Sequence, residues 1–163
     1  MSKKHTETID SKLKTAWQVV SRMYNSEAAL HDATISMAHF LLNVDSHEGS
    51  FASDIAPNLG MEGTSLSRII QSLESKKLIK RVADTQDARK TRIILTEEGK
   101  HQKEFAKNTV RNFNTLVEQK IGKQKLSDCY KVLDTIMEIA EEKIKSPSQP
   151  PQRGGVVKLE KQR

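Results

Sequence analysis

A helix-turn-helix pattern in the middle of the chain most constrains the fold. Residues 52–59 and 63–76 each carry apolar side chains at helical spacing, and a three-residue stretch that begins with Gly60 separates them. Two helices joined by three or four residues that include glycine form a helix-turn-helix unit. Pro57 falls inside the first of these helices, where it removes a hydrogen-bond donor. We therefore expect a kink there, or a helix that effectively begins near Pro57.

A β-hairpin is predicted directly after this unit. The runs LIKRVA and RIIL favour β structure, and they flank the polar stretch DTQDARKT. Thr96, Glu97 and Glu98 follow, and they supply an N-cap and two first-turn carboxylates that suit the helix dipole. A further helix is therefore expected to start at this point.

Amphipathic helices are predicted on both sides of the central unit. Apolar residues recur at spacings of three and four from Ile9 to Ala28, which indicates a long helix with one buried stripe. A shorter apolar segment covers residues 35–44 and ends in the loop-forming stretch DSHEGS. After the hairpin, one helix carries an apolar face over residues 105–117, and a last helix is expected to begin near Ser127. A small central domain cannot cover all these faces, so a homodimer is expected.

Positive charge is concentrated in two short segments of the 163-residue chain, whose net charge is +6. Residues 76–92 carry seven basic and two acidic side chains, and residues 146–163 carry four basic and one acidic. A localised anionic partner is therefore expected, although charge alone does not distinguish nucleic acid from anionic lipid. The tail from residue 146 combines proline, paired glycine and basic residues, which is typical of disorder.

The sequence predicts a cytoplasmic location and no membrane association. No apolar run approaches the roughly 18 residues that are needed to span a bilayer. The lysines near the N-terminus are not followed by the apolar stretch of a secretory signal. Cys129 is the only cysteine, so an intramolecular disulfide is not possible. On an apolar helix face without flanking cations, Cys129 is expected to be a small buried hydrophobe rather than a redox sensor.

No catalytic or metal-binding pattern stands out, so we expect neither an enzyme nor a metal or other cofactor. The seven glycines occur singly or in the tail, and none belongs to a phosphate-binding loop. His31, His39 and His47 are spaced by eight residues. That spacing is neither i,i+4 on a helix nor the spacing of a zinc finger.

The sequence of residues 50–99 resembles the winged helix-turn-helix core of the MarR family of bacterial transcription regulators. Six motifs in register carry the resemblance: Asp54-Ile55-Ala56, Ser65-Leu66-Ser67-Arg68, Leu73-Glu74, Leu78-Ile79-Lys80-Arg81, Asp87-Ala88-Arg89 and Leu95-Thr96-Glu97-Glu98-Gly99. Two positions depart from the family pattern. Gln86 replaces a common arginine, and Lys77 replaces the glycine that usually ends the second helix, where a left-handed residue is less favourable.

The resemblance implies a mainly α fold with a small β-wing, in which a winged helix-turn-helix is flanked by long N- and C-terminal dimerisation helices. Residues 1–32 are then an N-terminal dimerisation helix, and residues 33–99 are a DNA-binding winged helix-turn-helix domain. Residues 100–145 form C-terminal dimerisation helices, and residues 146–163 are a disordered basic tail.

The second helix of the unit is predicted to enter the major groove of DNA, because small and hydroxylic side chains in its N-terminal half allow close approach. The hairpin is predicted to reach the minor groove, where arginine is the preferred insert, and Arg89 is our candidate. The predicted DNA-binding residues are Gly63, Thr64, Ser65, Ser67, Arg68, Gln71, Arg89, Lys90 and Arg92. The resemblance implies that Asp87 instead stabilises the wing by pairing with a wing arginine.

The predicted function is that of a MarR-like, sequence-specific transcription regulator, acting as a homodimer on a pseudo-palindromic operator in double-stranded DNA. Because members of the family often bind small ligands between the dimerisation helices and the winged domain, the resemblance also admits a small-molecule effector. Winged helices also serve as docking domains, so the alternative is a protein-interaction (docking) module without DNA specificity. The cationic hairpin favours the first function, since a docking module does not need it.

Overall fold

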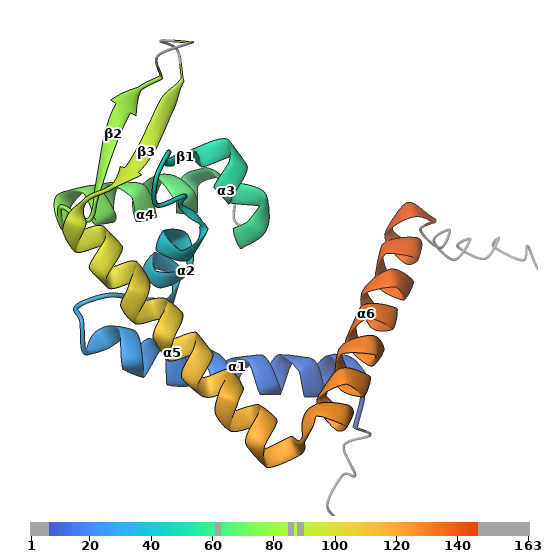
Figure 1. Ribbon diagram of the computed structural model, residues 1–163. Coiled ribbons are helices and arrows are strands. Elements are labelled where there is room, and N and C mark those ends of the chain that lie inside the picture. The colour runs from blue at the N-terminus through green and yellow to red at the C-terminus, as the bar shows by residue number, and fades with distance from the viewer. Residues whose placement is uncertain (1–6, 61–62, 85–86, 88–89, 147–163) are drawn as a thin grey trace, which may run out of the picture. The chain divides into compact units, whose positions relative to one another are not determined.

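The structure, a computed structural model, describes residues 7–60, 63–84, 87 and 90–146. It is mainly α-helical with one small antiparallel sheet, as the sequence predicts (Figure 1). The elements are α1 (Ile9–Ala29), α2 (Ile35–Asn43), β1 (Ser50–Phe51), α3 (Ala52–Leu59), α4 (Gly63–Ser75), β2 (Ile79–Ala83), β3 (Thr91–Leu95), α5 (Glu97–Ile121) and α6 (Lys123–Lys145). The chain divides into two compact units, Met1–Thr115 and Leu116–Arg163, with the boundary inside α5.

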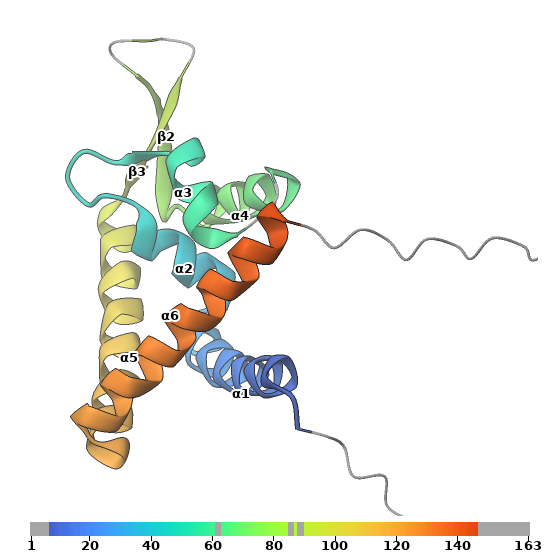
Figure 2. The same ribbon diagram turned by 90° about the vertical axis from the view of Figure 1, so that its right-hand side faces the viewer.

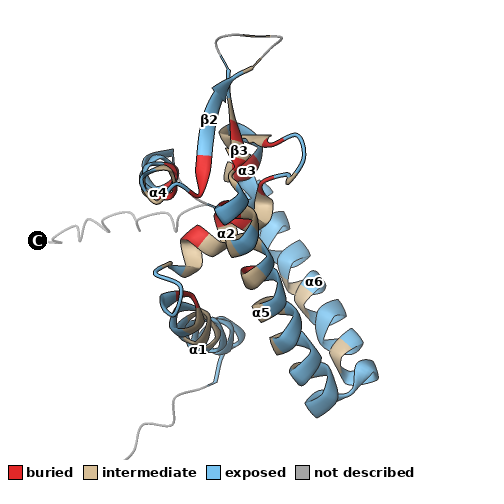
Figure 3. Cartoon of the chain, turned by 60° about the vertical axis from the view of Figure 1, so that its left-hand side comes forward, coloured by how far each residue is buried: buried red, intermediate tan, exposed pale blue. Residues whose placement is uncertain are grey.

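An apolar core in the first unit joins α2, α3, α4 and the sheet. Phe40 of α2 and Leu73 of α4 are fully buried in it, and Ile55 and Ile93 are nearly so. Figure 3 shows the buried segments gathered on α2, on α4 and at the base of the hairpin. Because the apolar side chains of α4 recur every three or four residues, one face of this helix is fixed in the core and the opposite face is left to solvent.

The sheet has the strand order β1-β3-β2, and both of its strand pairs are antiparallel. β2 and β3 form the predicted hairpin, which projects away from α3 and α4 (Figure 2). The two-residue strand β1 was not predicted, since it is too short to show an alternating pattern and follows a loop-forming sequence. Gly49, with φ +72°, precedes it and lies directly against the backbone carbonyl of Ile93, so β1 can approach β3 closely.

At the C-terminal end of α4, Lys77 takes the left-handed position that glycine usually occupies. Lys77 has φ +57°. Its N–H donates to the carbonyl of Glu74 at 2.9 Å, and the N–H of Leu78 donates to the carbonyl of Leu73 at 2.9 Å. These two bonds form a Schellman motif, with buried Leu73 and Leu78 in the positions that usually make its apolar contact. The cap and that apolar pair offset the strain at Lys77.

The start of α5 follows the prediction, because the Thr96 hydroxyl accepts the N–H of Gly99 at 3.0 Å. An ideal Cβ at Gly99 would lie 1.9 Å from the carbonyl oxygen of Leu78. We expect Gly99→Ala to lower the free energy of unfolding by about 3 kcal/mol, since overpacking against a fixed backbone is costly. Urea denaturation measures this. Gly63→Ala is the matched control, because a Cβ there meets no atom within 4 Å. Equal effects of the two substitutions would contradict the packing argument.

One helix boundary differs from the predictions, and one of the two alternatives for Pro57 is wrong. α3 spans Ala52–Leu59, as its apolar spacing predicts, so it does not begin near Pro57. Pro57 lies inside this helix, and its carbonyl accepts the N–H of Gly60 at 3.2 Å. The last helix begins at Lys123 rather than near Ser127, because Gly122 has φ +88° and separates α5 from α6 by a single residue.

Several predicted core positions are exposed in the single chain. The α1 stripe is buried at Ala28, but Ile9 and Trp17 are each 55% exposed. α6 contains no buried residue, and Cys129 on this helix is exposed. A fully buried α1 stripe and a buried Cys129 are therefore not found within one protomer. Helical spacing identifies an apolar face but does not say whether the same chain covers it.

Candidate nucleic-acid interface

The exposed face of α4 brings together the predicted major-groove residues. Leu66, Ile70 and Leu73 hold the other face of the helix in the core. The predicted residues on this helix are all exposed: Gly63, Thr64, Ser65, Ser67, Arg68 and Gln71. The Ser67 hydroxyl donates to the carbonyl of Gly63 at 2.9 Å, so it is partly engaged by its own helix. This face is therefore small and polar, with Arg68 as its cation.

An ion pair joins α4 to the first strand of the hairpin. Arg81 of β2 donates from Nε to the Glu74 carboxylate of α4 at 2.9 Å, and its Nη2 contacts the same oxygen. The hydrogen bond from Arg81 lowers the pKa of Glu74, which keeps this carboxylate ionised to lower pH. This half-exposed ion pair adds to the core contacts that orient the hairpin relative to α4.

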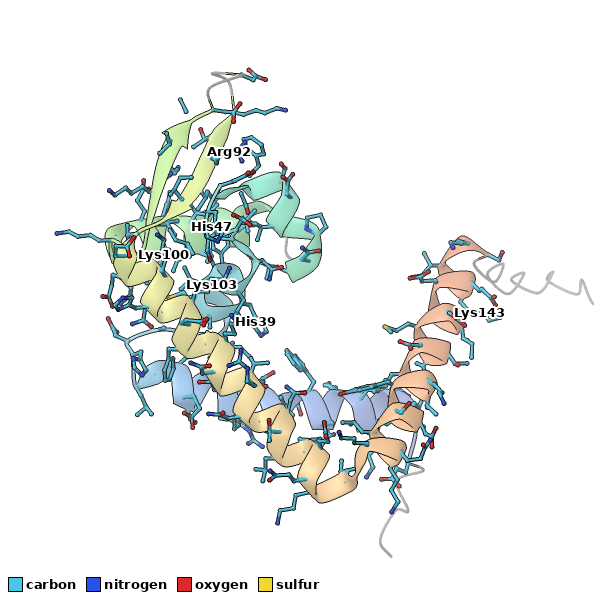
Figure 4. The ribbon with its side chains drawn as sticks, in the orientation of Figure 1. His39, His47, Arg92, Lys100, Lys103 and Lys143 are labelled. Atoms are coloured by element: carbon cyan, nitrogen blue, oxygen red, sulfur yellow. The ribbon has the colours of Figure 1, made fainter. Side chains whose placement is uncertain are left out.

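The wing cations have different environments. Lys90 is exposed, with its ammonium 5.7 Å from the ring centroid of Phe51. Arg92 is partly buried and pairs with Asp84 at 2.9 Å. Figure 4 labels Arg92 on the side of the hairpin that faces α3. Arg89, the predicted minor-groove insert, lies outside the described residues.

Asp84 and Asp87 both contribute to the shape of the wing. Asp87 donates its backbone N–H to the Asp84 carboxylate at 3.1 Å, and its carbonyl accepts the N–H of Lys90 at 2.8 Å. The carboxylate that pairs with Arg92 belongs to Asp84, which sequence reasoning did not single out. The predicted pairing of the Asp87 side chain with a wing arginine remains a prediction. Phe51 was also missed, because nothing in its local sequence indicates a contact with residues forty positions away.

A narrow cavity lies between α1, α2 and α5 in the first unit. Its volume is about 30 Å³, and its lining is mostly apolar, with Tyr24, Glu27, His31 and His39 among the polar groups. The imidazole of His31 lies against the ring of Phe105, at 3.7 Å between centroids. Burial lowers the pKa of His39, which is labelled in Figure 4, and raises that of Tyr24, so both stay neutral near pH 7.

Within the described part of the chain, no group of three or more histidine, cysteine, aspartate or glutamate side chains is placed to hold a metal ion. No helix among these residues is long and apolar enough to cross a membrane.

Comparison with known proteins finds a family match for the winged unit and a similar fold for most of the chain. The model of the MarR family matches residues 34–91. The DNA complex of S. aureus MepR is 22% identical with a TM-score of 0.75, covering 81% of this chain and 98% of that one. The transcriptional regulator SlyA is 20% identical with a TM-score of 0.73, covering 83% and 96%.

A MarR family regulator from Rhodococcus sp. RHA1 is also similar, at 20% identity and a TM-score of 0.68, covering 83% of this chain and 97% of that one. No curated protein matches the sequence. At these identities the structural likeness concerns the fold, while the family model concerns the sequence of the winged unit itself. Residues 34–91 are therefore a MarR family domain, in a chain with the fold of MarR family transcription regulators.

Proposed function

We propose that the protein is a sequence-specific DNA-binding transcription regulator. The observation that carries the proposal is the exposed polar face of α4 beside a cationic hairpin, in a unit that the MarR family model matches. The likeness to MepR supports it further, because that protein was solved in complex with DNA. In this proposal α4 enters the major groove and the wing approaches the minor groove.

Binding of duplex DNA by the purified full chain tests the proposal. We expect retarded migration of random duplex at low salt, and a much tighter complex with a duplex taken from a promoter near its own gene. A specific complex is typically about 10³-fold or more tighter than a non-specific one. Failure to bind either duplex at low salt would favour the docking-module alternative.

Arg68 is expected to carry base discrimination. Arg68→Ala should reduce the preference for the operator over random duplex by about 1–3 kcal/mol if the guanidinium reads a base edge. Competition binding with the two duplexes measures the difference. Ser65→Ala, on the same exposed face, tests a shorter side chain in the same way. An equal loss on both duplexes would make Arg68 a phosphate contact.

We also propose that the protein acts as a homodimer on a pseudo-palindrome. The support is apolar surface that one protomer leaves uncovered. On α1, Ile9 and Trp17 are each 55% exposed, and on α6 Met137 is 56% and Ile144 78% exposed. A second copy related by a two-fold axis would bury such faces. The two α4 helices would then lie about 34 Å apart, one turn of DNA. The division of the chain into four segments belongs to the same proposal. Residues 1–32 and 100–145 would form the dimer, residues 33–99 would bind DNA, and residues 146–163 would be a basic tail.

The cavity between α1, α2 and α5 is our proposed effector site. At about 30 Å³ it has room for a water molecule or two, so a ligand of ordinary size must spread the helices. The turn after α1 connects this site to α4. His31 lines the cavity, and the adjacent Asp32 forms an ion pair with Lys76, which directly follows α4. In this proposal, the Asp32–Lys76 pair links movement of the cavity wall to the end of the proposed recognition helix.

A further inference from the structure

Arg92 is held by three other segments of the winged unit. Its Nη2 and Nε lie 2.9 and 3.3 Å from Oδ2 of Asp84, at the end of β2. Its Nη1 lies 3.5 Å from the backbone carbonyl of Glu48, before β1. The guanidinium carbon is 4.3 Å from the ring centroid of Phe51, the residue opposite Arg92 in the β1·β3 register. All three guanidinium nitrogens are thus directed at the protein.

The burial of this cluster makes the pairing costly to break. The Asp84 side chain is 8% exposed and that of Arg92 is 29% exposed. A carboxylate removed from water to this extent requires compensating donors. If the guanidinium left Asp84 for a DNA phosphate, that largely buried carboxylate would lose its ion pair with Arg92. Arg92 is therefore poorly suited to be a DNA ligand, although its sequence position suggests one.

The contacts of Asp84 extend the cluster into the rest of the wing. Its other carboxylate oxygen, Oδ1, accepts the N–H of Asp87 at 3.1 Å, and its own N–H donates to the carbonyl of Lys90 at 2.9 Å. One carboxylate therefore joins Arg92 to the backbone that connects β2 with β3. Phe51 and Glu48 join the same guanidinium to the residues that lead into α3.

We propose that Arg92 is a positioning residue, which acts through Asp84 and Phe51 to fix the wing on the helix-turn-helix unit. This inference rests on the proposed DNA-binding function, and it assigns Arg92 to the geometry of the wing rather than to a contact with DNA. The ring of Phe51 provides a face for the cation, and the carboxylate of Asp84 sets the plane of the guanidinium.

The two possible roles of Arg92, DNA contact and wing positioning, predict opposite changes in DNA affinity when Asp84 is neutralised. Asp84→Asn removes a negative charge from a DNA-binding face, so electrostatics alone would strengthen binding. If Arg92 positions the wing, Asp84→Asn weakens binding instead, by about tenfold, because a charge-assisted pair is lost. Arg92→Met should weaken binding by a similar factor. The double variant should lose much less affinity than the product of the two single losses, since both changes remove the Asp84–Arg92 pair.

Arg92→Lys separates geometry from charge. Lysine keeps the positive charge, but it lacks the planar fork that contacts Asp84, Glu48 and the Phe51 ring together. A phosphate contact would largely survive this exchange. A positioning role predicts that Arg92→Lys loses nearly as much affinity as Arg92→Met. Glu104→Gln on α5, which removes an exposed carboxylate paired with Lys107, is the matched control for Asp84→Asn and should leave binding unchanged.

The experiment combines fluorescence anisotropy on operator duplex with amide hydrogen exchange on the free full-length protein. We expect the affinity losses above, together with faster exchange over residues 79–95 in Asp84→Asn and Arg92→Lys and unchanged exchange in α1. Tighter DNA binding by Asp84→Asn, or full rescue by lysine, would overturn the inference. So would wild-type exchange in the hairpin of both variants. If the wild type binds no DNA, the proposed function fails, while the exchange measurement still decides whether Arg92 holds the wing.

Discussion

Replacing Met137 with glutamate is expected to convert the protein from a dimer to a monomer and to lower its affinity for a two-half-site operator by at least about a hundredfold. Met137 is 56% exposed on α6, and the exposed or half-buried Tyr130, Leu133 and Ile136 lie at helical spacing before it. A carboxylate within this face would have to be buried without a partner on dimerisation. Two linked half-site contacts typically exceed one by about 10²–10⁴ in affinity, and the monomer loses that gain.

Light scattering and operator binding on the same samples check this prediction. Thr135→Glu is the control, because it adds the same charge to α6 about 200° around the helix from Met137. Thr135 is exposed, and its hydroxyl bonds only to the carbonyl of Lys131 among the described residues, so this variant should remain a dimer. A wild-type protein that is monomeric at micromolar concentration would contradict the dimer proposal outright.

The same exposed faces show what the sequence could and could not predict. The period of the α1 and α6 patterns correctly identified amphipathic helices, since the spacing is a property of one helix. Whether Trp17 or Met137 is covered depends on which surfaces meet them, and spacing carries no such information. The α4 face was predictable because Leu66, Ile70 and Leu73 determine which side is buried.

For the wing, the sequence predicted the strands but not the contacts of individual side chains. Its strands were predicted from β-branched runs, and both appear at nearly the expected residues. The role of Arg92 was not predictable, because it depends on Phe51 and Glu48, which precede α3 and α4 in the sequence. A charge count treats Lys90 and Arg92 alike, whereas the structure leaves Lys90 exposed and encloses most of Arg92.

Arg89→Ala is expected to flatten the salt dependence of operator binding by about 1.8 in the slope of log K against log salt. Counterion release contributes about −0.9 per neutralised phosphate, and a dimer loses two such cations, one from each protomer. Arg89 follows β2 and precedes β3 in the sequence, within the cationic segment 76–92. The prediction applies whether Arg89 enters the minor groove or contacts a phosphate.

The measurement is a salt titration of operator binding for Arg89→Ala and for a control cation of equal charge. Lys107 on α5 is suitable, because it is exposed and pairs only with the neighbouring Glu104, at 2.9 Å, among the described residues. Lys103, labelled in Figure 4, is not suitable, since its ammonium donates to the carbonyl of Val44 and burial lowers its pKa.

Lys107→Ala should leave the slope nearly unchanged, because its charge lies far along α5 from the hairpin and is already partnered by Glu104. The salt dependence of operator binding by Arg92→Met gives a third slope for comparison. If Arg92 positions the wing, its loss also detaches Arg89, so the Arg92→Met slope should flatten by about as much as that of Arg89→Ala, and the double variant should flatten no further. Arg89→Ala with unchanged affinity and unchanged slope, in a variant with a wild-type circular dichroism spectrum, would mean that the wing makes no DNA contact. The hairpin would then be better explained as part of a docking module.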